Sequence, residues 1–229
     1  MGPDSDALAD LERRVTSCRA CPRLVAWREE VAEVKRAAFA DQDYWGRPIP
    51  GFGDRDARIL LLGLAPAAHG ANRTGRIFTG DRSGDFLFAA LHRTGFANQP
   101  TSEHRDDGLA LSGAWITAAV RCAPPANKPL PVERDRCLPW TLSELDHLPN
   151  VGVVVCLGAF GWDAALRLAA AKGVRARPRP KFGHGAEVVV GGWTLLGCFH
   201  PSQQNTFTGV LTEPMIDAVL HRARELAAI

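Results

Sequence analysis

The chain has 229 residues, of which 46% are hydrophobic and 23% are charged, and its formal net charge is +2. This composition is typical of one compact globular domain and excludes a chain that is mostly disordered. No apolar run approaches the roughly 20 residues of a membrane-spanning helix, and the first ten residues are acidic where a secretory signal would be basic and then apolar. We therefore expect a single-domain, monomeric, cytoplasmic protein with no membrane contact.

The basic residues are mostly arginine, because the 27 lysines and arginines include only four lysines, which leaves 23 arginines. Arginine can bind phosphate through paired hydrogen bonds, although a bias in coding composition would give the same count. The densest basic run, residues 172–181, reads KGVRARPRPK, and its prolines exclude a helix. Such a run is most often a solvated loop, but near a nucleic-acid site Arg175, Arg177 and Arg179 would contact phosphate.

The spacing of apolar residues predicts an N-terminal pair of helices over residues 5–18 and 22–40, joined at the sequence CRAC. Pro22 suits the first turn of the second helix. Helical patterns continue along the chain, and Pro139 should kink one of these later helices. The later helices are predicted over residues 83–94, 131–148, 159–172 and 213–228.

Short apolar runs that end in glycine, proline or polar loops predict buried strands. They cover residues 58–63, 114–120, 151–158 and 193–199. The last strand follows another apolar run through Gly191 and Gly192, a pattern that predicts a hairpin. Because strands and helices alternate, the fold class is α/β, with a mostly parallel sheet covered by helices on both faces.

The loops that follow the four strands are the candidate functional positions, since open parallel sheets bind ligands outside the carboxyl ends of their strands. In chain order they read GLAPAAHGANRTGRIFTGD, RCAPPANKP, LGAFGW and CFHPSQQNT. None is a Walker phosphate loop, and none has the dinucleotide pattern G-x-G-x-x-G after its strand. This argues against an enzyme that uses a nucleotide cofactor.

The six cysteines form two groups. Cys156 and Cys198 lie in predicted strands, where an unliganded cysteine acts as a small hydrophobic residue. The other four lie near loops and are suited to an all-thiolate site for zinc or for an iron–sulfur cluster: Cys18, Cys21, Cys122 and Cys137. The latter two flank a proline-rich segment instead of forming a second C-x2-C pair, which favours a cluster over a zinc ribbon, with four unrelated thiols as the remaining alternative. Either metal site would tie the N-terminal helices to the sheet.

Together, the strand-end loops and the four cysteines resemble the family 5 (type B) branch of the uracil-DNA glycosylase superfamily, from Cys18 through Thr206. The resemblance implies a four-stranded parallel sheet sandwiched between helices in three layers, and a [4Fe–4S] cluster on the four cysteines. It also implies excision of uracil and other deaminated bases, such as hypoxanthine, from DNA by hydrolysis of the N-glycosidic bond. The chain would be one glycosylase domain over residues 1–229, with residues 1–40 a helical pair tied on by the cluster.

The resemblance also assigns substrate contacts. Gly63, Ala65, Pro66 and Ala67 match the motif that borders the abasic sugar and the water, and Phe78 matches the aromatic residue on which the flipped base stacks. Better-known branches hold a water-activating acid where this chain has Ala65, so no general base is available at that position. An ordinary core position is the alternative for Phe78.

His200 and Ser202 belong to an HPS sequence that matches a superfamily motif, and the place of the histidine after a buried strand favours function over structure. We expect His200 to donate a hydrogen bond to the base as it leaves with negative charge. Asp81 either positions the water or caps the next helix. Asn127 is the candidate to contact the base, because Ala118 stands where family 4 relatives carry an asparagine.

The expected partner is DNA that contains uracil or other deaminated bases. Gln203, Gln204 and Asn205 are candidates to enter the gap left by a flipped nucleotide, while Arg73 and Arg76 are candidates for phosphate contact, with a solvated surface as the alternative. Two other classes stay open. A non-catalytic iron–sulfur protein that binds DNA lesions would explain the missing acid, and an iron–sulfur electron carrier would leave the strand-end loops unexplained.

Overall fold

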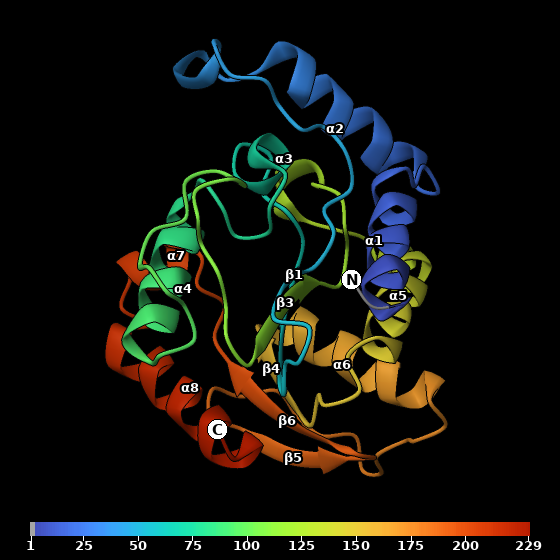
Figure 1. The fold of residues 1–229 in the computed structure, drawn as a ribbon, viewed down its shortest axis with the longest axis vertical. Coiled ribbons are helices and arrows are strands. Elements are labelled where there is room, and N and C mark those ends of the chain that lie inside the picture. The colour runs from blue at the N-terminus through green and yellow to red at the C-terminus, as the bar shows by residue number, and fades with distance from the viewer. Residues whose placement is uncertain (1–2) are drawn as a thin grey trace.

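The computed structural model describes the backbone of residues 3–229 and the side chains from residue 7 onward. At its centre lies a sheet with the strand order β1-β3-β2-β4-β6-β5 (Figure 1). The strands are β1 (Phe52–Gly53), β2 (Ile59–Gly63), β3 (Ala114–Ala118), β4 (Val153–Leu157), β5 (Glu187–Val190) and β6 (Trp193–Cys198). The four inner strands run parallel, and an antiparallel strand pairs with each edge. The expected four-stranded parallel sheet is therefore the core of a mixed, six-stranded one.

The two edge strands differ in how far the sequence predicts them. β5 pairs with β6 so that Val190 lies opposite Trp193, which confirms the hairpin at Gly191 and Gly192. β1 is a two-residue strand inside a glycine- and proline-rich stretch, and it pairs Phe52 with Ile116 of β3. It has no apolar run of its own, so the sequence pattern does not predict it.

The helices largely match the predicted ranges. They are α1 (Pro3–Thr16), α2 (Pro22–Val34), α3 (Ala71–Thr74), α4 (Arg82–Arg93), α5 (Pro131–Asp146), α6 (Ala159–Ala171), α7 (Gln203–Phe207) and α8 (Glu213–Ala227). The second predicted helix is too long, because Lys35 adopts a positive φ of 58° and ends α2. α5 continues as one helix through Pro139. None of the described helices combines the length and the apolar character needed to cross a bilayer.

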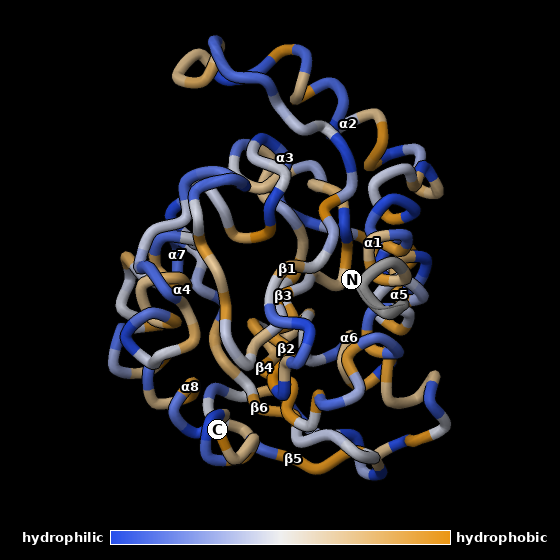
Figure 2. The backbone as a smooth tube through the Cα atoms, in the orientation of Figure 1, coloured by the Kyte–Doolittle hydropathy of each residue, from blue (hydrophilic) through white to orange (hydrophobic). Residues whose placement is uncertain are grey.

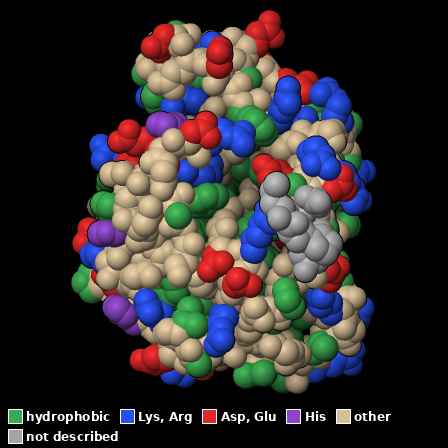
Figure 3. Space-filling view, in the orientation of Figure 1, with side chains coloured by type: hydrophobic (Ala, Val, Ile, Leu, Met, Phe, Trp, Pro, Cys, Tyr) green, Lys and Arg blue, Asp and Glu red, His purple; other side chains and the backbone are tan. Residues whose placement is uncertain are grey.

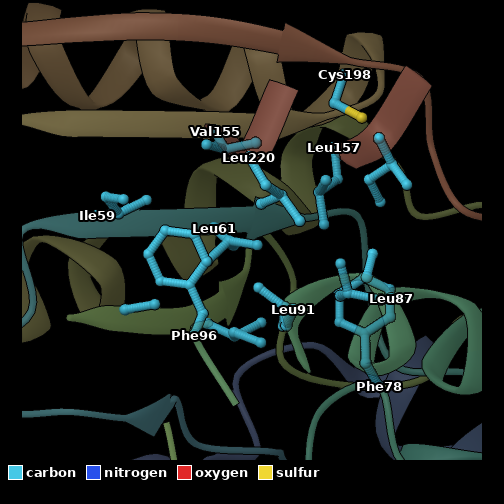
Figure 4. Close-up of a cluster of buried hydrophobic side chains, with 14 of the residues drawn as sticks. Ile59, Leu61, Phe78, Leu87, Leu91, Phe96, Val155, Leu157, Cys198 and Leu220 are labelled. Atoms are coloured by element: carbon cyan, nitrogen blue, oxygen red, sulfur yellow. The ribbon is translucent and has the colours of Figure 1, made fainter. Parts of the chain in front are cut away.

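Helices cover both faces of the sheet, which gives the three layers implied by the resemblance (Figure 1). On one face, α4 and α8 pack against side chains such as Leu61 and Val155, part of the buried cluster drawn in Figure 4. On the other face, α1, α5 and α6 cover Leu60 and Val154. Successive residues of each inner strand are buried on opposite faces, so these strands are apolar throughout, as the hydropathy in Figure 2 shows.

Candidate active site

The loop after β2 folds back over the end of that strand. The ring of Phe78 lies over Gly63, where a β-carbon would stand only 3.0 Å from Cε2. Phe78 has a φ of 51°, in the left-handed region that bulky residues rarely adopt, and its carbonyl oxygen lies tightly against Gly84 in the first turn of α4. Such backbone strain persists only where the surroundings enforce it, often at functional sites. Phe78 is 8% exposed and belongs to the buried hydrophobic cluster on this face of the sheet.

His200 comes from the loop after β6, and its ring centroid lies 6.0 Å from that of Phe78. Gly158, at the end of β4, lies so close that a β-carbon there would be 3.2 Å from Cβ of His200. Burial lowers the pKa of His200 to about 4, so the imidazole is neutral at pH 7 and carries one N–H. No group of residues 7–229 hydrogen-bonds the imidazole. The fold thus brings His200 beside Phe78 with a neutral donor that a ligand can use.

The short helix after His200 holds this loop in place. Ser202 caps α7 by accepting from the backbone N–H of Asn205, and Nδ2 of Asn205 donates to the carbonyl oxygen of His200 over 2.8 Å. Asn205 therefore uses its amide inside the protein, whereas the neighbouring Gln203 and Gln204 are exposed. Of the three residues expected at the gap in the DNA, the two glutamines are the ones whose side chains are free to reach out.

Asp81 caps α4, because its Oδ1 accepts from the backbone N–H of Gly84 over 3.0 Å. Its other oxygen lies directly against Gly70, in the same loop that begins with the Gly63 motif. Burial raises the pKa of the Asp81 carboxyl. The capping role is thus confirmed, and the second oxygen lies against the loop after β2.

Two other expected site residues, Ala65 and Asn127, have different surroundings. Ala65 packs against the buried group around Cys21 and Cys122. Asn127 is exposed on the turn after β3, where it and Ala126 both adopt a positive φ. Its side chain neither donates a hydrogen bond to a described residue nor accepts one from it. The side chain of Asn127 is therefore not held in place by the described residues, and its contact with the base stays a prediction.

The two arginines of the first loop brace the protein. Arg76 is 5% exposed and forms paired hydrogen bonds with Asp107, which hold the pKa of that carboxyl well below its usual range. Burial and this ion pair argue against the phosphate contact expected of Arg76, because its charge is already neutralised. Arg73 donates to the carbonyl oxygens of His69 and Gly80 and so closes the loop on itself.

The basic run at 172–181 extends along the molecule instead of gathering at the strand ends. Val174 packs against Gly191 in the hairpin turn, which lies at the amino end of β6, so the neighbouring Arg175 lies far from His200. Arg179 forms an ion pair with Asp163 in α6. Only the end of this run approaches the carboxyl ends of the strands.

Four thiols meet where α1 and α2 face the end of β3. They line one narrow pocket: Cys18, Cys21, Cys122 and Cys137. Nη1 of Arg28 donates to Sγ of Cys122 over 2.9 Å, and the backbone N–H of Arg121 points to Sγ of Cys137 over 3.4 Å. Within the described residues, no three His, Cys, Asp or Glu side chains converge on the position of a single metal ion. Cys156 and Cys198 are buried in β4 and β6, as expected.

The comparisons with known proteins agree with this architecture. Residues 50–224 match the family model described as the uracil DNA glycosylase superfamily. A protein of Mycobacterium tuberculosis named Type-5 uracil-DNA glycosylase is 57% identical over 97% of this chain and 83% of its own length. A protein of the same name from Thermus thermophilus is 54% identical over 94% of this chain and 96% of its own. The chain belongs to the family 5 uracil-DNA glycosylases.

Family 5 uracil-DNA glycosylases are DNA N-glycosylases, so the chain is an enzyme of this class. A Type-4 uracil-DNA glycosylase of Archaeoglobus fulgidus is more distant, with 29% identity over 68% of this chain and 61% of its own length. Two features of this glycosylase were missed from sequence: the closeness of Gly158 to His200 and the bond from Asn205 to the His200 carbonyl. The signal for the first was a glycine as the last residue of a predicted strand.

Proposed function

We propose that this chain removes uracil, and with it other deaminated bases such as hypoxanthine, from DNA by hydrolysing the N-glycosidic bond. The observation that carries this proposal is the pair of His200 and Phe78 at the carboxyl ends of the parallel strands, 6.0 Å apart between ring centroids. A flipped base needs an apolar surface to lie against and a donor for its polar edge, and this pair offers both.

His200 stabilises the departing base. The base leaves as an anion while the sugar becomes cationic, so a fixed donor at the base lowers the barrier most. With a pKa of about 4 the imidazole is neutral, and its N–H supplies that donor without protonation of the ring. The bonds of Ser202 and Asn205 hold the loop before the base arrives, which keeps the donor preorganised.

Asp81 orients the attacking water. Ala65 provides no carboxylate and lies on the side of the thiols, whereas the second oxygen of Asp81 faces the loop that begins at Gly63. The breadth of substrate follows from Ala118, which is 2% exposed and offers no amide to the base edge. A pocket that leaves fewer polar groups unpaired rejects fewer bases, because rejection comes from such unpaired groups.

The four pocket thiols would hold a [4Fe–4S] cluster. The four thiols line one narrow pocket, and the proline-rich segment between Cys122 and Cys137 favours a cluster over a zinc ribbon. Arg28 and Arg121 place donors on two of the sulfurs, which suits a group with net negative charge. Such a cluster would tie α1 and α2 to the sheet, and the excision chemistry described above proceeds at His200 without it.

Duplex oligonucleotides with a single uracil or a single hypoxanthine test the proposal. After incubation with the purified protein, hot alkali cleaves the strand wherever a base has been lost. We expect scission at both lesions and none at the matched undamaged duplex. Binding without scission would instead support a non-catalytic lesion-binding protein, and scission at uracil alone would remove the broader substrate range.

A further inference from the structure

An open groove of about 610 Å³ lies between the end of α1, the helix α2 and residues 44–47. It is separate from the pair of His200 and Phe78. Four arginines and one glutamate are its charged lining residues: Arg13, Arg19, Arg28, Arg47 and Glu29. Figure 3 shows basic side chains gathered on this side of the molecule, where α1 meets α2.

The groove keeps most of its positive charge. Its one acid, Glu29, is occupied by paired hydrogen bonds from Arg19. Arg13 is 69% exposed, and its one carboxylate partner among residues 7–229 is the exposed Asp10 on its own helix, an interaction that water weakens. Arg47 is exposed, lies over the ring of Trp45 at 5.7 Å and has no carboxylate partner among residues 7–229.

One lining residue of the groove, Arg28, carries a buried donor. The side chain of Arg28 is 2% exposed, and its Nε has no hydrogen-bond partner in the described chain. A buried, unpaired donor is costly unless a ligand or water completes it. Together with the free charge of Arg47, this points to an anionic occupant.

One wall of the groove is bonded to the active-site loop. The backbone N–H groups of Trp45 and Gly46 donate to the carbonyl oxygens of Arg73 and Asn72, and the hydroxyl of Tyr44 lies 3.0 Å from Nδ1 of His69. The other wall ends at the thiols beyond β3, so the groove opens at the same end of the sheet as His200. Arg28, a lining residue of the groove, donates to Cys122 just after β3, and three strand spacings of about 4.8 Å separate β3 from β6. This lateral separation of about 14 Å corresponds to roughly four base pairs of DNA.

We propose that this groove binds the sugar–phosphate backbone of the same DNA duplex whose damaged base lies at His200, about four base pairs from that base. The inference rests on the proposed glycosylase activity and adds a second contact region to it. Arginine side chains suit phosphate because they bind two of its oxygens at once. The contact is independent of base sequence and adds affinity without touching the reacting atoms.

The test compares Arg13→Gln/Arg47→Gln with Arg55→Gln/Arg58→Gln, which removes the same charge from two exposed residues just before β2, at the opposite end of the sheet. The probe is a duplex with a stable abasic-site analogue, and its affinity is measured over about 50 to 200 mM salt. We expect the groove variant to lose about two units of the slope of log affinity against log salt, and the control variant to keep the wild-type slope. The single-turnover rate of the groove variant at saturating enzyme should equal that of the wild type.

Duplex length provides the second measurement. Trimming one flank to fewer than about four base pairs beyond the lesion should weaken binding by the wild type and leave the groove variant unaffected, since its contact is already lost. An unchanged salt slope in the groove variant, or an equal loss in the control variant, would overturn the proposal. Failure of the glycosylase itself is distinguishable, because the wild type would then show no lesion-dependent scission at all.

Discussion

The ring of Phe78 stands over Gly63 so closely that a β-carbon at position 63 would lie 3.0 Å from Cε2 and 3.1 Å from Cζ. The change Gly63→Ala must therefore push the ring away from its place beside His200. We expect a cost of about 1 to 3 kcal/mol in the free energy of unfolding, the usual penalty of overpacking. We also expect the single-turnover excision rate to fall by about tenfold or more, since small misplacements at a site are costly.

The matched control is Gly152→Ala. Gly152 lies just before β4, has no positive φ and has no heavy atom within 4 Å of an added β-carbon. This variant should keep the stability and the rate of the wild type. If Gly63→Ala is destabilised yet excises uracil at the wild-type rate, the ring of Phe78 does not contact the base.

His200→Ala removes the neutral donor. We expect the single-turnover rate to fall by roughly two to three orders of magnitude, the scale of losing one preorganised hydrogen bond to a developing anion. Affinity for uracil-containing duplex should change little, because the donor acts mainly in the transition state. His221→Ala, on the exposed side of α8, is the control and should excise normally. A full rate in His200→Ala would move the search for the donor to Asn127.

Much of this architecture could be predicted from sequence because inner parallel strands are continuous apolar runs, as in Ile59–Gly63 and Val153–Leu157. The edge strand Phe52–Gly53 could not, since two residues carry no periodicity. The helices Ala71–Thr74 and Gln203–Phe207 are too short for the same reason. Strand-end motifs located the site, but they do not show which side chains the fold has already paired.

Arg76 illustrates this last limit. Its position in the first loop predicts phosphate contact equally well whether its charge is free or paired. The partner, Asp107, lies 31 residues away and is brought to it only by the folded chain. Asp81 is the opposite case, because capping is a local interaction and was among the two roles expected for it.

Asp81→Asn separates those two roles. Asparagine caps helices about as well as aspartate, so the free energy of unfolding should stay near that of the wild type. If the carboxylate orients the water, excision of uracil and of hypoxanthine should slow by the same factor, because attack on the sugar is common to both. Asp81→Ala should show the same loss of rate and, in addition, about 1 kcal/mol of lost stability. Wild-type rates in Asp81→Asn would leave Asp81 as a cap alone.

The lowered pKa of His200 predicts how the free energy of unfolding depends on pH. Its pKa is about 4 in the folded protein and about 6.5 in an unfolded chain, so the unfolded state binds the proton more readily between these values. The neutral imidazole therefore contributes its full stabilisation above pH 6.5. This contribution is lost as the pH falls toward 4, which lowers the free energy of unfolding by about 3 kcal/mol at the most. Denaturant unfolding at several pH values should show a smaller acid loss in His200→Gln than in the wild type. An equal acid loss in both proteins would contradict the lowered pKa.

The thiol pocket makes the last prediction. Protein purified without oxygen should be brown and contain four irons and four sulfides per chain if Cys18, Cys21, Cys122 and Cys137 hold a [4Fe–4S] cluster. Cys18→Ala should lose iron and lower the unfolding temperature more than it changes the single-turnover rate of the folded fraction, because the thiol ties α1 and α2 to the sheet and lies apart from His200. Cys156→Ala is the control: that thiol is fully buried in β4, so its loss should cost some stability through a small cavity and leave the iron content unchanged. Zinc in place of iron, or iron retained in full by Cys18→Ala, would exclude this ligand set.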